Sequence, residues 1–415
     1  MDDTGLEPVT STMSRYVDHS VTLQSARYVG YDLDAAIDRR ADSVAACNVN
    51  VAWITNLPND PATVSRYVTA FRERGIEIVA GSGHWYIGEW NYARTGGSIY
   101  GPYRHLRAAI GERVSYRVNV ADDQVATIMR LIEGMPVNAR PWKWSLADEP
   151  PPSALSALRQ LADRCRRAGI PTTLVQVPEY HQQTLTALGA SVPLVCEDVY
   201  PWFKPGLGPV DPVAWCKTEQ LASVSRCRTA GVQPLIMTQG FGDASLFALP
   251  SLSRTRWQIW SAVAAGSPGV VVFAHGLPRD YPGSVSLVDW DRETEQLTAH
   301  GVTVRDAFAR LKTVETRLAG ATLETTPKWV GSVLRGDCVA VYRSGTVRTL
   351  IVVADPDAAG QRTLKVTLPG VSVASPLASS TGGTLQAWPW PWSLFIPATL
   401  QVAIQPGEAW VGEIR

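Results

Sequence analysis

Short apolar runs alternate with amphipathic helical stretches over most of this 415-residue chain. Eight such runs predict strands, at residues 27–31, 49–54, 76–80, 141–147, 172–177, 192–196, 234–238 and 269–273. Eight strands, each followed by a helix, predict an α/β fold of the (β/α)8 TIM barrel type. The rival fold is a doubly wound open sheet, but no Gly-rich phosphate-binding loop follows any of the strands.

Proline, aspartate and glycine mark where the predicted helices begin and end. Asp60-Pro61 and Asp211-Pro212 each combine a good N-cap side chain with a proline at the first helical position. The first of these helices is predicted to end at Gly75, because glycine readily adopts the left-handed conformation that ends a helix. A long insertion, at about residues 84–135, carries several aromatic residues and one or two predicted helices.

After Gly320 the pattern changes to short strands separated by turn residues. It predicts a small antiparallel β-sandwich, docked rigidly on the barrel because no Pro/Gly/Ser-rich linker separates the two. The predicted strands of this domain are residues 330–334, 338–342, 349–353, 363–368, 394–396 and 409–413. The predicted domains are an unstructured or mis-assigned start at 1–24, a catalytic barrel at 25–320 and a β-sandwich at 321–415.

The charge balance narrows the range of partners. Lys and Arg together number 38, as do Asp and Glu, so the formal net charge is zero. A neutral chain without a basic tract is not expected to bind nucleic acid or an anionic membrane surface. No 18-residue apolar run and no apolar leader occur, so neither a membrane span nor a signal peptide is predicted. The chain as given is expected in the cytoplasm, or outside the cell if its start is mis-assigned.

The cysteines and histidines indicate neither a metal nor a cofactor. The six cysteines lie far apart without a CxxC pair, which excludes a zinc ribbon and a thioredoxin-like motif. Their apolar and helical contexts predict buried free thiols rather than disulfides. His84 and His275 lie at strand ends but lack a third His and a clear carboxylate partner, so no metal site is predicted.

Two strands end in adjacent carboxylates, at the barrel face where TIM-barrel enzymes place their chemistry. The fourth ends in Asp148 and Glu149, which either cap the turn before a proline or take part in catalysis. The sixth ends in Glu197 and Asp198, and strand alternation lets only one of these face the barrel axis. We expect Asp198 and Tyr200 to face inward and Glu197 to pair outward with a helix Lys or Arg.

The remaining strand ends suit a neutral sugar. A side-chain amide hydrogen-bonds hydroxyls, and aromatic rings stack on the C–H faces of sugars. Tryptophan, at 15 residues, outnumbers both tyrosine and phenylalanine. A carbohydrate is therefore the predicted ligand, and the sequence indicates no oligomeric state. The predicted substrate-binding residues are Trp53, His84, Trp85, Asp148, Tyr200, Trp202, Gln239, Phe241 and His275.

Asp148-Glu149-Pro150 resembles the Asn-Glu-Pro of clan A glycoside hydrolases, in which the Glu is the acid/base. The order of barrel and β-sandwich, and the segment 257–273, are similar to that clan as well. The resemblance implies a glycosidase of a neutral poly- or oligosaccharide with Glu149 as general acid/base. Two positions depart from the clan pattern: Asp148 replaces the usual Asn, and Gln239 occupies the seventh-strand position of the nucleophilic Glu.

Gln239 leaves three interpretations open. Asp198 is the second carboxylate, as base or nucleophile; or the chain is a glycosidase inactivated by a Glu→Gln replacement; or the barrel binds carbohydrate without cleaving it. Because the fourth and sixth strands are not adjacent, we expect a wide gap between Glu149 and Asp198, which favours inversion. A barrel lyase or aldolase is a remote alternative, since the one barrel-strand lysine, Lys143, lies early in its strand.

Overall fold

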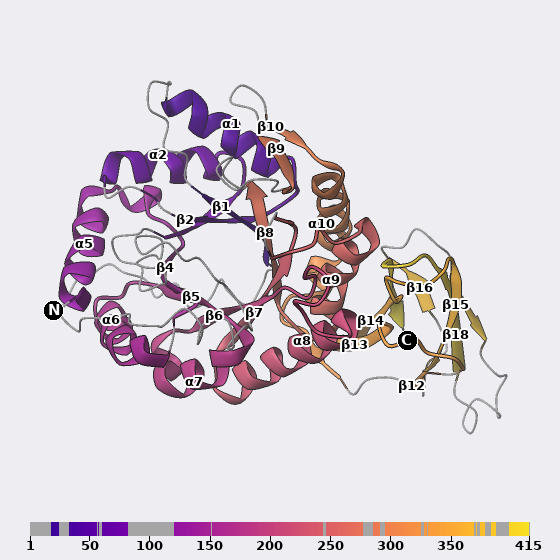
Figure 1. The fold of residues 1–415 in the computed structure, drawn as a ribbon. Coiled ribbons are helices and arrows are strands. Elements are labelled where there is room, and N and C mark those ends of the chain that lie inside the picture. Colours follow the sequence, from indigo (N-terminus) through magenta and orange to yellow (C-terminus); the bar gives the residue numbers. More distant parts are fainter. Residues whose placement is uncertain are drawn as a thin grey trace.

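Eight parallel strands form a closed barrel surrounded by helices (Figure 1). The computed structural model describes residues 18–24, 33–55, 57, 60–81, 120–150, 152–243, 246–276, 285–290, 295–324, 328–329, 331–368, 371, 374–377, 383–386 and 398–414. The first strand pairs with both the second and the eighth, which closes the sheet and confirms the predicted TIM barrel. The strands are β1 Asp18–Gln24, β2 Val51–Thr55, β3 Glu77–Ala80, β4 Lys143–Asp148, β5 Thr172–Gln176, β6 Leu194–Val199, β7 Gln233–Gln239 and β8 Gly269–Gly276.

The helices begin where the sequence places its caps. Asp60 accepts a hydrogen bond from the Thr63 N–H at 2.7 Å, and Asp211 accepts one from the Ala214 N–H at 3.1 Å. The described helices are α1 Leu33–Ala45, α2 Pro61–Arg72, α5 Val120–Gly134, α6 Leu155–Arg167, α7 Pro178–Leu188, α8 Pro212–Thr229, α9 Leu252–Ala264 and α10 Ala299–Leu318. A short hairpin of β9 Val288–Trp290 and β10 Glu295–Leu297 follows β8.

The first barrel strand differs from the prediction. β1 lies at Asp18–Gln24, inside the stretch 1–24 that the sequence assigned to an unstructured start. Buried parallel strands usually appear as continuous apolar runs. In β1 the apolar residues Val21 and Leu23 alternate with polar ones, so the strand was overlooked in favour of the stretch 27–31. That stretch lies outside the described residues, as does most of the insertion, of which α5 is described.

The C-terminal domain consists of two antiparallel sheets around a core of its own. The predicted strand 330–334 is wrong over residues 331–334, which form an exposed connection that begins at Gly331 with φ +88°. The predicted strand 394–396 lies outside the described residues. The strands are β11 Thr322–Leu323, β12 Lys328–Trp329, β13 Cys338–Ser344, β14 Val347–Val353, β15 Arg362–Leu368, β16 Ala374–Pro376, β17 Gly383–Gln386, β18 Ala398–Ile404 and β19 Ala409–Ile414.

The barrel and the β domain share one continuous apolar core. Residues of β13, β14 and β19 belong to the same buried cluster as the helices around the barrel. Trp257 of α9 donates its ring N–H to the Gly336 carbonyl at 2.7 Å, and the Tyr342 hydroxyl donates to the Val263 carbonyl. Gly407 lies so close to α9 that a Cβ would stand 2.1 Å from the Ser253 carbonyl oxygen. The β domain is therefore packed tightly against α9.

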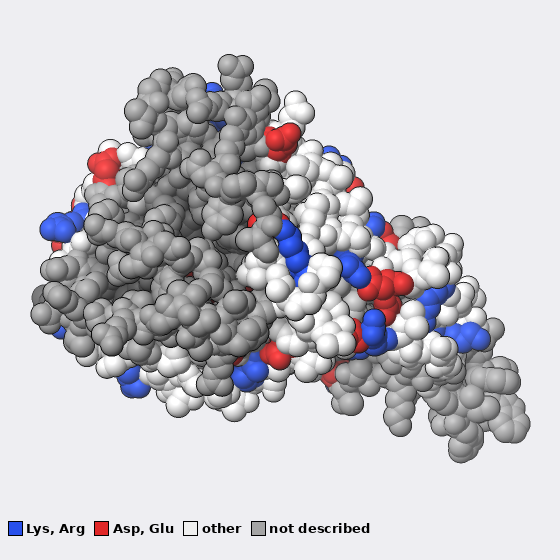
Figure 2. Space-filling model, viewed as in Figure 1, with Lys and Arg blue, Asp and Glu red and all other residues white. Residues whose placement is uncertain are grey.

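The surface carries both charge signs in similar measure. In Figure 2, Lys and Arg side chains alternate with Asp and Glu over the described part of this face, without a continuous patch of one sign. No helix among the described residues is both long and apolar enough to cross a membrane. All six cysteines are free and buried, in agreement with the sequence prediction.

Candidate active site

The carboxylates of β4 meet at the C-terminal end of the barrel. Asp148 is the last residue of β4, and Glu149 follows it with its backbone N–H bonded to the Val175 carbonyl of β5 at 3.0 Å. Glu149 is 4% exposed and has φ +46°. A non-glycine residue in the left-handed region costs about 1–3 kcal/mol and persists only where its surroundings impose it. Such strained residues concentrate at functional sites.

The β6 carboxylate joins them in the same place. Asp198 is 6% exposed, and its side chain is hydrogen-bonded to those of Glu149 and Tyr200. The Tyr200 hydroxyl also lies 2.9 Å from Met237 Sδ of β7. The predicted inward orientation of Asp198 and Tyr200 thus agrees with the structure. The expected wide gap to Glu149 does not: strong barrel curvature brings side chains of non-adjacent strands together across the axis.

Burial dominates the electrostatics of this carboxylate cluster. It raises the pKa of Asp148 to about 6. The pKa of Asp198 is raised well above its ordinary value, first by burial and then by the charge of Asp148, with the two hydrogen bonds acting in the opposite direction. A contact between two carboxyl groups requires a proton between them. The cluster therefore retains at least one proton at neutral pH.

Asp148→Asn is expected to stabilise the protein at neutral pH. The raised pKa means that the folded state binds this proton more tightly than the unfolded state, so stability falls as pH rises from about 4 to about 6. Asn does not ionise, so above pH 7 the variant's free energy of unfolding should exceed that of the parent by an amount on the order of 1–3 kcal/mol. Urea unfolding at pH 4 and pH 8 measures it; an equal difference at both pH values would contradict the assignment.

Glu197 lies on the opposite side of β6 from Asp198. Its carboxylate is fully buried, contacts His181 of α7 and accepts hydrogen bonds from the Arg226 guanidinium of α8 at 3.1 Å. The predicted pairing of Glu197 with a helix Arg is confirmed. Burial, and then Arg226, lower the pKa of His181 to about 3, so the imidazole is neutral. Glu197 thus fastens β6 to its covering helices and leaves Asp198 to the site.

Aromatic rings line the side of the site formed by β6, β7 and β8. The Tyr200 ring lies edge-on to Phe241 and Phe247, with centroid distances of 5.5 and 5.8 Å, and is tilted against Phe273 at 6.0 Å. Phe241 is predicted to stack on substrate, but it is 5% exposed and packs within this cluster. Phe203, Phe247 and Phe273 were not predicted from the sequence; Phe203 and Phe247 follow β6 and β7, and Phe273 lies within β8.

Gln239 does not face an open site. Its amide oxygen accepts the Trp202 N–H at 3.0 Å, and its amide nitrogen lies 2.9–3.0 Å from the carbonyls of Trp202, Phe241 and Ala248. Its backbone N–H and carbonyl are bonded to the side chain of Gln258 on α9. The side chain is fully buried, so the predicted contact of this amide with a sugar hydroxyl is not supported. Gln239 instead ties together the loops after β6 and β7.

Three other residues that were predicted to contact sugar are buried and packed against protein groups in the described structure. Trp53 is 1% exposed and belongs to the apolar cluster inside the barrel. Trp202 is 2% exposed, with the Arg254 guanidinium 4.3 Å from its ring centroid. His275 is 1% exposed, with Nε2 3.0 Å from the Ser43 hydroxyl of α1. Sequence cannot separate a strand-end aromatic that faces solvent from one that a later segment covers.

The last two predicted contacts, His84 and Trp85, lie outside the described residues. Of the eleven predicted site residues, the structure brings Asp148, Glu149, Asp198 and Tyr200 together, with Phe241 packed against Tyr200. Within the described part of the chain, no group of three or more His, Cys, Asp or Glu side chains is arranged to hold a metal ion. The described site is thus a cluster of three carboxyl groups beside a phenol.

Comparison with known proteins supports the fold. No protein-family model and no curated protein matches the chain. The chain is similar to the solved structure of an alpha-amylase from H.orenii, with TM-score 0.57, 8% identity and coverage of 97% of this chain and 100% of that one. It is also similar to a glycoside hydrolase family 30 subfamily 8 xylanase from Clostridium acetobutylicum, with TM-score 0.53, 10% identity and coverage of 97% and 98%.

A third similar structure is a maltogenic alpha-amylase from Thermotoga neapolitana, with TM-score 0.50, 8% identity and coverage of 95% of this chain and 98% of that one. These proteins share a nearly full-length alignment with the chain. The chain therefore has the fold of the TIM-barrel glycoside hydrolases, as its resemblance to clan A implied. At such identities the likeness extends to fold alone.

Proposed function

We propose that this protein is a glycoside hydrolase whose catalytic carboxyl groups are Glu149 and Asp198. The observation that carries the proposal is the buried contact between these two side chains, with Glu149 held at φ +46°. Hydrolysis of a glycosidic bond needs an acid that protonates the leaving oxygen and a carboxylate on the other side of the bond. A pair that retains one proton at neutral pH fits both requirements.

Glu149 is the proposed general acid/base, and Asp198 is the proposed nucleophile or base. The hydrogen bonds with Glu149 and Tyr200 favour the charged form of Asp198, but burial and the charge of Asp148 outweigh them and raise its pKa. Asp148 places negative charge near Asp198 and opposes its ionisation. Tyr200 remains protonated, because burial and then Asp198 raise the pKa of its hydroxyl well above the ordinary value.

The close contact favours retention of anomeric configuration over inversion. Retaining enzymes hold their carboxyl groups about 5–5.5 Å apart, whereas inverting enzymes leave about 6.5–9.5 Å for a water molecule. A pair in hydrogen-bond contact has to open by only a small distance to admit a glycosidic oxygen. The zero net charge of the chain supports a neutral poly- or oligosaccharide as the substrate.

A panel of neutral glycosides tests the proposal. Aryl glycosides of common hexoses and pentoses, together with neutral oligosaccharides, are incubated with the protein, and released sugar is measured. Proton NMR of the first product then gives its anomeric configuration, and we expect the configuration of the substrate. Product of the opposite anomer would overturn the retaining assignment, and no release from any substrate would contradict the enzyme itself.

A carbohydrate-binding barrel without catalysis is less well supported. Binding of this kind relies on exposed aromatic faces, and Trp53 and Trp202 are buried in the described structure. Buried carboxyl groups with raised pKa values reduce stability, and a mere binding protein gains nothing from them. The enzyme is therefore the function that the geometry favours.

A further inference from the structure

Arg254 connects the β domain to the loop after β6. It lies in the first turn of α9, with its guanidinium 4.3 Å from the ring centroid of Trp202. The same guanidinium forms a two-pronged ion pair with Asp357 of the β domain, with distances of 2.7 and 3.0 Å. A planar guanidinium can stack on an aromatic face and bind a carboxylate in its own plane at the same time. Arg254 uses both modes here.

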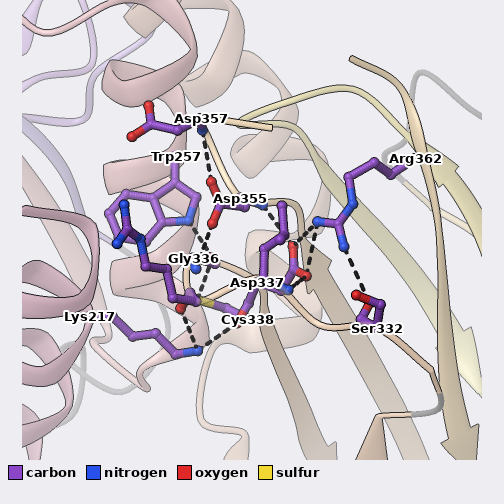
Figure 3. A network of polar contacts seen from close by, with 11 residues as sticks. Lys217, Trp257, Ser332, Gly336, Asp337, Cys338, Asp355, Asp357 and Arg362 are labelled. Atoms are coloured by element: carbon purple, nitrogen blue, oxygen red, sulfur yellow. Dashed lines mark hydrogen bonds and ion pairs between the residues drawn. The ribbon is translucent and has the colours of Figure 1, made fainter. Parts of the chain in front are cut away.

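Asp357 is held in place by buried groups of its own domain (Figure 3). Its backbone N–H donates to one oxygen of Asp355 at 2.8 Å, and the other oxygen accepts the Gly336 N–H at 2.8 Å. The Asp355 N–H in turn donates to the carboxylate of Asp337, which pairs with Arg362. Asp337 is fully buried and Asp355 is 4% exposed. The carboxylate that Asp357 presents to α9 is thus attached to a rigid base.

On the barrel side, Trp202 lies in the same loop segment as Tyr200, which belongs to the carboxylate cluster. Both backbone polar groups of Trp202 are bonded to the Gln239 amide, at 3.0 Å each. Trp202 lies two residues after Tyr200, whose side chain is hydrogen-bonded to Asp198. Arg254 on the ring and Gln239 on the backbone therefore fix the segment that carries Tyr200.

We propose that Asp357 and Arg254 are positioning residues for the Asp198–Tyr200 pair, so that the β domain takes part in organising the active site. The inference rests on the proposed glycosidase function. The Arg254–Asp357 ion pair holds the Arg254 guanidinium against the Trp202 ring and thereby limits motion of the loop after β6. Displacements of about 1 Å at a reacting group can cost on the order of 100-fold in rate.

The same interface provides a matched control. Arg256, two residues further along α9, pairs with Glu408 of the β domain, and Glu408 also pairs with Arg310 of α10. This second ion pair joins the same helix to the same domain. Among the interactions of the described residues, neither Arg256 nor Glu408 contacts Trp202. Removal of either ion pair should therefore weaken docking of the β domain, whereas only removal of the Arg254–Asp357 pair should disturb the position of Trp202.

Asp357→Asn and Glu408→Gln in the full chain are the test. Amide hydrogen exchange of the peptide spanning Tyr200 and Trp202 should quicken roughly tenfold in D357N and stay unchanged in E408Q. With the best substrate of the glycoside panel, D357N should lower kcat roughly tenfold with KM nearly unchanged, and Asp357→Glu should recover part of the loss. E408Q should lower the melting temperature without this change in kcat.

Two results would overturn the inference. Equal exchange in the two variants, or equal loss of kcat, would show that Asp357 only docks the domain. Should the parent protein hydrolyse no glycoside, the proposed function fails, but the exchange measurement still decides whether Asp357 holds the loop. Arg254→Lys extends the test: it keeps a positive charge for Asp357 but loses the planar stack on Trp202, and the same quickened exchange is expected.

Discussion

Glu149→Gln should lower the rate of hydrolysis by about 10²–10⁴-fold for sugars with poor leaving groups. Gln has nearly the shape of Glu but cannot donate a proton to the glycosidic oxygen. The loss should shrink strongly for aryl glycosides whose leaving group needs no protonation, such as a dinitrophenolate. Steady-state rates on one sugar with two aglycones of different acidity measure this difference.

Asp198→Asn is the companion variant, and it separates the two roles. A nucleophile is needed whatever the leaving group, so this variant should lose activity equally on both aglycones. Both variants should be as stable as the parent or more so, since each removes one ionisable group from a buried cluster. An E149Q protein that folds and retains full activity on the poor leaving group would contradict the assignment of Glu149.

The carboxylate cluster explains why several side-chain contacts hold β6 and the loop that follows it, one of them through the β domain. β6 carries the buried Asp198 carboxyl group, whose ionisation is opposed by burial and by the charge of Asp148. Glu197 fastens the outer face of that strand to His181 and Arg226. Gln239 and Arg254 fasten the loop that follows it. Preorganised sites commonly depend on such supporting contacts, because catalysis requires the groups to be held before the substrate arrives.

Most of the barrel, and the placement of Glu149 and Asp198 at its C-terminal end, could be predicted from sequence, because the relevant signals are local. Strand alternation required Glu197 and Asp198 to face opposite sides of the strand, and the structure agrees with the expectation that Asp198 faces inward. Asp-Pro pairs located two helix starts correctly. β1 was missed because only Val21 and Leu23 in it are apolar. Its partners on both sides, β2 and β8, are separated from each other by more than 200 residues in the chain.

The side-chain environments could not be predicted in the same way. Whether Trp202 faces a substrate or an arginine depends on where α9 and the β domain pack, and no local pattern contains that information. Arg254 and Asp357 are 103 residues apart in the sequence. The gap between Glu149 and Asp198 was expected to be wide from strand order, but strand order around the barrel wall does not show how closely side chains approach one another inside it. Long-range packing determines each of these features.

Gln239→Glu should destabilise the protein by at least about 3 kcal/mol at pH 8 rather than create a nucleophile. The amide nitrogen of Gln239 faces three backbone carbonyls, and a carboxylate there would place negative charge against three acceptors. Burial would also raise the pKa of the new carboxyl group. The folded state would then bind its proton more tightly than the unfolded state, so the defect should grow as pH rises from about 5 to about 8. Urea unfolding at these two pH values measures it.

Gln239→Met is the matched control for charge. It removes the same hydrogen bonds without adding an ionisable group, so its loss of stability should be the same at both pH values. The comparison also decides between the interpretations that Gln239 leaves open. A Q239E protein that is stable and gains glycosidase activity over an inactive parent would show that Gln239 stands in for a nucleophile, and Asp198 would lose its role. An unstable Q239E beside an active parent places the chemistry on β4 and β6, with Gln239 holding the loops above them.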